Sequence, residues 1–141
     1  MRKTLQICFS ALLLSLVFHG CKKDTKGVPY VYVNINIYVS DPQFVNLNAI
    51  GGWTYVTGGY RGILIYRKSQ TEFMAYDRAC PYDPQDAAEQ VKVDNTNIQA
   101  VDDHCGSKFL ITDGSVTNGP SGLPLKAYST HYDGTVLRIY N

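Results

Sequence analysis

The chain has 141 residues, which suffice for one domain with its own hydrophobic core but not for two ordinary domains. A hydrophobic content of 45% is typical of globular proteins and excludes an intrinsically disordered chain. The formal net charge of +1 provides no basic surface for nucleic acid, so we expect no nucleic-acid partner.

The N-terminus has the organisation of an export signal. A basic start, Arg2 and Lys3, precedes an apolar run over residues 5–18, which is too short to predict a membrane span. Gly20 and Cys21 end the run, and a small residue followed by cysteine at this point resembles the cleavage site of bacterial lipoproteins. We expect lipid on Cys21 to anchor the chain to a membrane of the bacterial cell envelope. The alternatives are an ordinary signal peptide and an uncleaved N-terminal anchor.

This interpretation divides the chain into a signal peptide over residues 1–20, a lipidated N-terminus and tether over residues 21–29, and a domain over residues 30–141. The domain is rich in Tyr, Val, Ile and Thr and is regularly interrupted by Gly and Pro, which predicts β-structure. Alternation over residues 31–39 predicts a half-buried strand. Its apolar face consists of Val31, Val33, Ile35, Ile37 and Val39.

Further short strands are predicted between turns that contain Gly, Pro, Asp or Asn. They cover residues 53–57, 62–67, 73–77, 91–93, 98–101, 109–111, 125–128 and 136–140. Residues 44–49 are ambiguous between an extended segment and a helical turn, and residues 85–90 allow at most a turn or two of helix. The pattern predicts an all-β domain, either a small antiparallel sandwich or a barrel.

The most specific motifs lie within residues 80–125. In order they are Cys80-Pro81-Tyr82, His104-Cys105-Gly106-Ser107-Lys108-Phe109, Asp113-Gly114-Ser115-Val116, and Gly119-Pro120 leading to Pro124-Leu125. Their order and spacing resemble the Rieske iron–sulfur domain family, over residues 51–141. In that family two loops, Cys-Pro-His and Cys-Pro-Cys-His-Gly-Ser-x-Phe, hold a two-iron cluster at one end of a sandwich of small sheets. The resemblance therefore implies a Rieske-like antiparallel β-sandwich with the Cys80 and Cys105 loops at one end.

The resemblance is weakest at the cluster ligands. A Rieske [2Fe-2S] centre needs two thiolates on one iron and two imidazoles on the other. By the family pattern, Cys80 falls on the first cysteine, but Tyr82 falls on the first histidine. Asp102 falls on the second cysteine and Cys105 on the second histidine. Because a phenol and a carboxylate are hard oxygen donors, we expect no cluster, no other cofactor, no metal and no catalytic residue.

Two alternatives remain open on the sequence. An electron-transfer protein that partners a membrane oxidoreductase would hold a [2Fe-2S] cluster through Cys80 and Cys105, with His104 a weaker candidate. A metal ion bound by His104 with Asp102 and Asp103 is the second alternative, although such short runs more often form solvated loops. His131 lies in a C-terminal segment where the family places no ligand.

The two remaining cysteines suggest a disulfide instead. Cys8 lies in the signal peptide and Cys21 carries lipid, which leaves Cys80 and Cys105 in the domain. Two thiols in an exported protein usually form one disulfide, and the resemblance implies that these two loops face each other. The bond would stabilise the domain by about 3 kcal/mol. We therefore expect a non-enzymatic protein with a structural or interaction role and a protein partner that the sequence does not identify.

Overall fold

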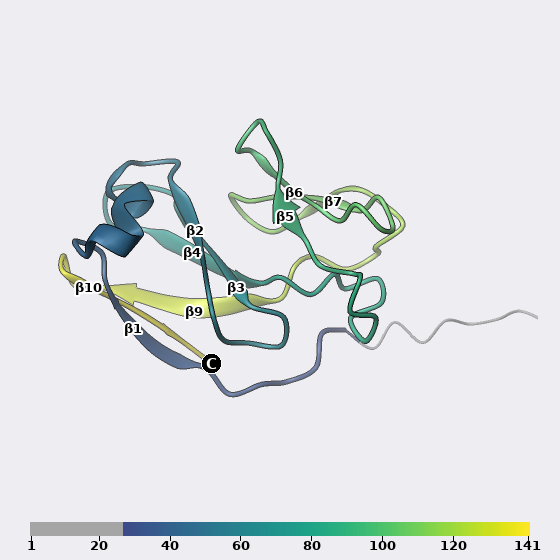
Figure 1. The fold of residues 1–141 in the computed structure, drawn as a ribbon, viewed down its shortest axis with the longest axis horizontal. Coiled ribbons are helices and arrows are strands. Elements are labelled where there is room, and N and C mark those ends of the chain that lie inside the picture. The colour runs from purple at the N-terminus through teal and green to yellow at the C-terminus, as the bar shows by residue number, and fades with distance from the viewer. Residues whose placement is uncertain (1–26) are drawn as a thin grey trace, which may run out of the picture.

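Two antiparallel sheets form the fold in the computed structural model, which describes residues 27–141 (Figure 1). The large sheet has the order β1 (Asn34–Tyr38), β10 (Val136–Tyr140), β9 (Ala127–Tyr132), β4 (Phe73–Asp77), β3 (Ile63–Arg67) and β2 (Trp53–Val56). The small sheet has the order β5 (Lys92–Val93), β6 (Gln99–Val101), β7 (Lys108–Leu110) and β8 (Val116–Asn118). A 3-10 helix, η1 (Pro42–Asn48), follows β1. The predicted all-β, antiparallel fold class is confirmed.

The predicted signal peptide and the lipidation of Cys21 fall on residues that lie outside the described part of the chain, and they stay predictions. Most of the tether falls there as well. Within residues 27–141, no helix is long and apolar enough to cross a membrane.

The alternating segment near the N-terminus forms one edge of the large sheet. Val33, Ile37 and Val39 are buried, because successive side chains of a strand point to opposite faces. β1 pairs with β10 so that Ile37 lies opposite Leu137, and both residues join the first hydrophobic core. The apolar face that the sequence predicted is therefore the core face.

Strands β3 and β4 lie between two cores. Ile63, Leu64 and Ile65 are all fully buried, so β3 is covered on both faces. Ile63 and Ile65 pack into the core of the large sheet, whereas Leu64 packs into a second core with Phe109 of β7. The small sheet thus stands against one end of the large sheet (Figure 1), and the second core joins them.

A buried carboxylate fixes the end of β4. Oδ1 of Asp77 accepts hydrogen bonds from the backbone N–H groups of Arg61 (3.1 Å) and Ala79 (2.9 Å). Oδ2 accepts from the backbone N–H of Tyr60 (2.5 Å) and from the Tyr128 hydroxyl (2.6 Å). Burial, followed by this bond to Asp77, raises the pKa of Tyr128, so the hydroxyl keeps the proton that it donates. Asp77 therefore joins β9 and the β2–β3 turn to the segment that leads to Cys80.

The β8 segment and residues 85–90 differ most from the sequence-based expectation. β8 was not predicted, because its residues are partly or fully exposed and carry no apolar alternation. Residues 85–90 form turns rather than helix. Pro81 and Pro84 interrupt the preceding backbone, and the Asp86 carboxylate accepts a bond from the N–H of Ala88 (2.9 Å). The segment ends in an isolated bridge between Gln90 and Ala79, which returns the chain to the Cys80 loop.

Candidate functional site

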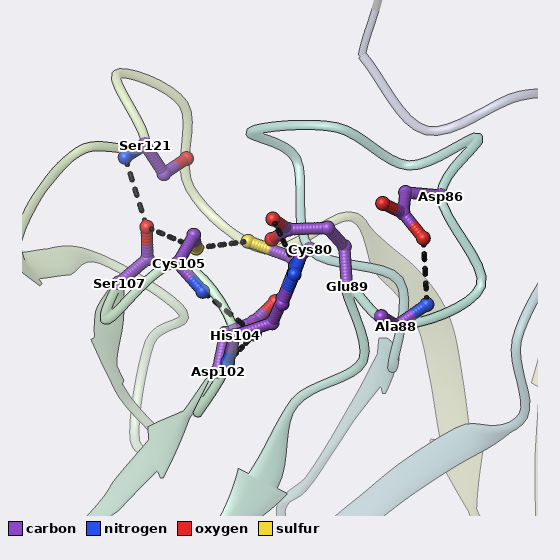
Figure 2. A network of polar contacts seen from close by, with 9 residues as sticks. All are labelled: Cys80, Asp86, Ala88, Glu89, Asp102, His104, Cys105, Ser107 and Ser121. Carbon is purple, nitrogen blue, oxygen red and sulfur yellow. Dashed lines mark hydrogen bonds and ion pairs between the residues drawn. The ribbon is translucent and has the colours of Figure 1, made fainter.

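Cys80 and Cys105 meet at the end of the molecule where the two sheets join. Cys80 follows β4 and is fully buried, whereas Cys105 lies in the β6–β7 turn and is half-buried. Their Sγ atoms are 3.7 Å apart (Figure 2). The prediction that the two loops lie together at one end is confirmed.

The two cysteines are free thiols in this structure, so the predicted disulfide is not present in it. Their sulfur atoms are in van der Waals contact but lie well beyond the S–S bond length of about 2.05 Å. Burial raises the pKa of both thiols above the ordinary value. The neighbouring carboxylates, Asp102 for Cys80 and Glu89 for Cys105, raise it further. Without a cation, both sulfur atoms therefore keep their protons.

Asp102 lies immediately after β6 and is fully buried. Its Oδ1 atom accepts hydrogen bonds from the backbone N–H groups of His104 (2.8 Å) and Cys105 (3.4 Å). Its own N–H donates to the carbonyl of Ser107, and its carbonyl accepts from Gly106, which closes a tight turn. Gly106 has a φ of +81°, a conformation that residues with a Cβ rarely adopt. Oδ2 of Asp102 is buried without a hydrogen-bond partner.

Glu89 is a member of the site that the sequence did not reveal. It is only 3% exposed, and its backbone carbonyl accepts a bond from the N–H of Cys80 (3.0 Å). Oε1 lies 3.1 Å from Nδ1 of His104, while Oε2 is buried without a partner. Figure 2 shows the Glu89 carboxylate beside the Cys80 sulfur. No sequence motif marks Glu89. The turns over residues 81–88 bring it to the two cysteines, and these turns can be seen only in the folded chain.

Four donor groups thus converge on one point. The Sγ atoms of Cys80 and Cys105 and one carboxylate oxygen each of Glu89 and Asp102 all lie within 4.8 Å of one another. His104 borders this group, but 56% of its side chain is exposed, and it contacts the site through Glu89. This four-residue set is called the thiol–carboxylate group below.

The other sequence candidates take supporting or remote positions. Tyr82, at the first histidine position of the family pattern, packs against the core of the small sheet. Asp103 is exposed and forms an ion pair with Lys92. His131 lies in β9, opposite Arg138 in the large sheet, and does not belong to the thiol–carboxylate group.

The Gly-Pro segment that follows β8 is attached to the same loops through Ser107. The buried Ser107 hydroxyl accepts a bond from the backbone N–H of Ser121 (2.9 Å) and lies 3.1 Å from the Cys105 sulfur. Ser121 in turn donates through its hydroxyl to the carbonyl of Leu123 (2.8 Å). Three loops are therefore connected around the two sulfur atoms (Figure 2).

Comparison with known proteins identifies the fold. No protein-family model and no curated protein matches the sequence. The solved plasma membrane Rieske protein PetC3 of the cyanobacterium Synechocystis PCC 6803 matches with a TM-score of 0.56 at 19% identity, covering 76% of this chain and 99% of that one. A structure provisionally assigned as an NADH-dependent nitrite reductase small subunit from Mycobacterium tuberculosis matches with a TM-score of 0.46 at 12% identity, covering 79% and 97%. The first likeness shows that this chain has a Rieske-like fold, as its motifs implied.

Proposed function

We propose that this protein is a lipid-anchored protein of the bacterial cell envelope whose Rieske-like domain holds no iron–sulfur cluster and serves a structural or interaction role. The observation that carries the proposal is the composition of the thiol–carboxylate group. It offers two thiols and two carboxylates, and none of its members is a histidine.

The donors do not fit a Rieske cluster. Such a centre needs two imidazole ligands on one of its irons. Within residues 27–141, His104 is the one histidine that borders the group, and its Nδ1 atom faces Glu89 rather than the sulfur atoms. Carboxylate oxygen is a poor replacement for these ligands, because iron–sulfur clusters favour soft donors. The alternative, a [2Fe-2S] electron-transfer protein that partners a membrane oxidoreductase, draws support from the two thiols alone.

Membrane attachment through Cys21 agrees with the description of PetC3 as a plasma membrane protein. Attachment is tested by growing cells with a radioactive fatty acid. The wild-type chain is expected to take up label, and Cys21→Ser is expected to take up none. Equal labelling of both chains, or of neither, would remove the lipid anchor from the proposal.

The loss of the cluster is tested on protein purified in detergent from the envelope of cells with intact cluster-assembly machinery. A Rieske protein that retains all four ligands, produced in the same cells, serves as the positive control. We expect the control to be coloured and to give the electron paramagnetic resonance signal of a reduced [2Fe-2S] centre. This protein is expected to be colourless and silent after reduction, whereas a cluster signal at a stoichiometric level would establish the electron-transfer alternative.

A further inference from the structure

We infer that Cys80, Glu89, Asp102 and Cys105 form a binding site for a single divalent zinc ion. The inference rests on the proposed absence of an iron–sulfur cluster, because both would use the same two sulfur atoms. It assigns a ligand to the end of the domain where two buried carboxylates face two thiols.

The sulfur–sulfur distance matches one tetrahedral ion. Two thiolates bound at about 2.3 Å in tetrahedral geometry lie about 3.8 Å apart. The Sγ atoms of Cys80 and Cys105 are 3.7 Å apart before any metal is bound. Both carboxylates also provide an oxygen within 4.8 Å of each sulfur. Metal binding therefore requires only a small contraction of groups that are already in place.

The two carboxylates are arranged as monodentate ligands. Asp102 uses Oδ1 for two backbone N–H groups, and Oδ2 is buried with no hydrogen-bond partner. Glu89 repeats the arrangement, because Oε1 pairs with His104 and Oε2 is buried with no partner. A buried carboxylate that only a weakly donating thiol faces is unfavourable, and a bound cation removes the penalty for both residues together.

A disulfide alone does not explain these two carboxylates. Bonding Cys80 to Cys105 would remove both thiol protons and leave the buried oxygens of Glu89 and Asp102 with no donor. The mixed donor set also limits the metal. Magnesium and calcium prefer all-oxygen sites, whereas zinc accepts cysteine sulfur and carboxylate oxygen in one tetrahedral shell.

Groups behind the ligands orient them, as is usual in metal sites. The imidazole of His104 holds Glu89, and two backbone N–H groups hold Asp102. The Ser107 hydroxyl already accepts a bond from Ser121, so its own proton is free to donate to a Cys105 thiolate 3.1 Å away. Zinc binding releases one proton from each thiol to solvent. The hydrogen bonds from His104, the backbone N–H groups and Ser107 then spread the negative charge of the four ligands.

The test uses mature protein purified in detergent from the envelope, reduced and stripped of metal. Zinc is the probe, its affinity is measured by competition with a chromophoric chelator, and Co²⁺ reports thiolate ligation through its visible spectrum. We expect one zinc per chain. Glu89→Gln and Asp102→Asn are expected to weaken zinc binding by more than about 100-fold. Loss of a residue that only orients a metal ligand typically weakens binding by about 10–100-fold. Cys80→Ser and Cys105→Ser are expected to abolish the Co²⁺–thiolate bands.

Matched controls are Asp103→Asn and Asp86→Asn, which change exposed carboxylates next to Asp102 and in the loop that carries Glu89. Both are expected to bind zinc as tightly as the wild type. The inference is overturned if the reduced wild type binds no zinc, or if Glu89→Gln and Asp102→Asn bind as tightly as the controls. Circular dichroism shows which variants are folded. If a variant is unfolded, the number of zinc ions bound per wild-type chain decides whether the inference holds. Stoichiometric iron and sulfide in the protein before it is stripped of metal would instead overturn the proposed function.

Discussion

At the scale of single residues, the unusual feature of this domain is the pair of carboxylates buried against two thiols. Glu89 and Asp102 each have one oxygen held by an N–H group or the His104 ring and one buried oxygen with only a thiol to donate to the carboxylate. Such an arrangement makes the metal-free fold less stable, because a thiol is a weak hydrogen-bond donor for a buried carboxylate. The site is therefore built at the expense of stability, which is a frequent property of binding sites.

Glu89→Gln separates the stability of the domain from its zinc binding. In the metal-free protein we expect this change to raise the free energy of unfolding by about 1 kcal/mol, since an amide is less costly to bury than a carboxylate. Added zinc is expected to raise the melting temperature of the wild type but not that of Glu89→Gln. Thermal unfolding with and without zinc provides the measurement. A loss of stability in metal-free Glu89→Gln would contradict this account of Oε2.

The two thiols give a second prediction at this scale. In the metal-free protein, an added disulfide reagent is expected to oxidise Cys80 and Cys105 to a protein disulfide. The reagent accepts two electrons, and the two thiols lose two protons. Thiol titration of the unfolded mature chain, with Cys21 excluded, should then find no free thiol before reduction and two after it. Reduction is expected to lower the free energy of unfolding by about 3 kcal/mol.

Zinc is the control for this oxidation. The zinc-bound protein is expected to keep both thiols under the same treatment, because the sulfur atoms are held as metal ligands. Persistence of two free thiols in the oxidised, metal-free protein would show that Cys80 and Cys105 do not approach each other more closely than the 3.7 Å of this structure.

At the scale of secondary-structure elements, Asp77 is the residue that fixes the Cys80 loop to the sheet. Asp77→Asn replaces one of its carboxylate oxygens by an NH2 group, which cannot accept from the donors that face it. We expect a loss of about 3 kcal/mol in the free energy of unfolding, measured as the midpoint in urea. Asp133→Asn is the control, because Asp133 also accepts two backbone N–H bonds but is exposed. Equal losses in the two variants would refute the role of Asp77.

Most strands could be predicted because their own residues determine them. β1 alternates between buried and exposed side chains, and β4 begins and ends at the predicted residues 73 and 77. β9 starts two residues later than predicted and extends to Tyr132, because it pairs with both β10 and β4. The β8 segment could not be predicted, since Val116–Asn118 has no apolar pattern and is ordered by pairing with β7.

The site was less predictable than the strands. Cys80 and Cys105 could be placed together because the motifs around them resemble a family in which these loops face each other. Asp102 was recognised as a ligand position and considered as a metal ligand with His104 and Asp103, but the expectation was that no metal binds. Glu89 lies 15 residues from its partner His104, and only the folded loop brings the two together. Sequence reasoning found the residues at the family's ligand positions but not Glu89, which the folded chain adds to them.

At the scale of the whole molecule, the pKa of Tyr128 links folding to pH. The pKa is raised by burial and then by the bond to Asp77, so the folded state holds this proton at pH values where the unfolded state has lost it. The stabilisation is complete below the ordinary tyrosine pKa of about 10 and declines above it, by at most about 1.4 kcal/mol per pH unit. Urea midpoints measured from pH 9 upward should therefore fall more steeply in the wild type than in Tyr128→Phe.

Tyr32→Phe is the control for this slope, because Tyr32 is 69% exposed. It is expected to leave the decline at alkaline pH unchanged. A Tyr128→Phe protein that loses stability as steeply as the wild type would show that other groups produce the alkaline effect.

The whole molecule combines a Rieske-like fold with a set of donors that suits one ion better than a cluster. The two cores hold the loops that bring two thiols and two carboxylates together. With the proposed lipid anchor and the inferred zinc ion, the domain would carry a metal that takes no part in one-electron transfer, because zinc has no accessible redox change.

The most direct test of this account is an elemental analysis of one sample of protein purified from the cell envelope, without added metal or chelator. Iron, zinc and acid-labile sulfide are measured against the protein concentration. The account predicts that iron and sulfide are absent and that zinc approaches one per chain. Two irons and two sulfides per chain would contradict it and would establish a [2Fe-2S] protein with ligands other than the usual two histidines.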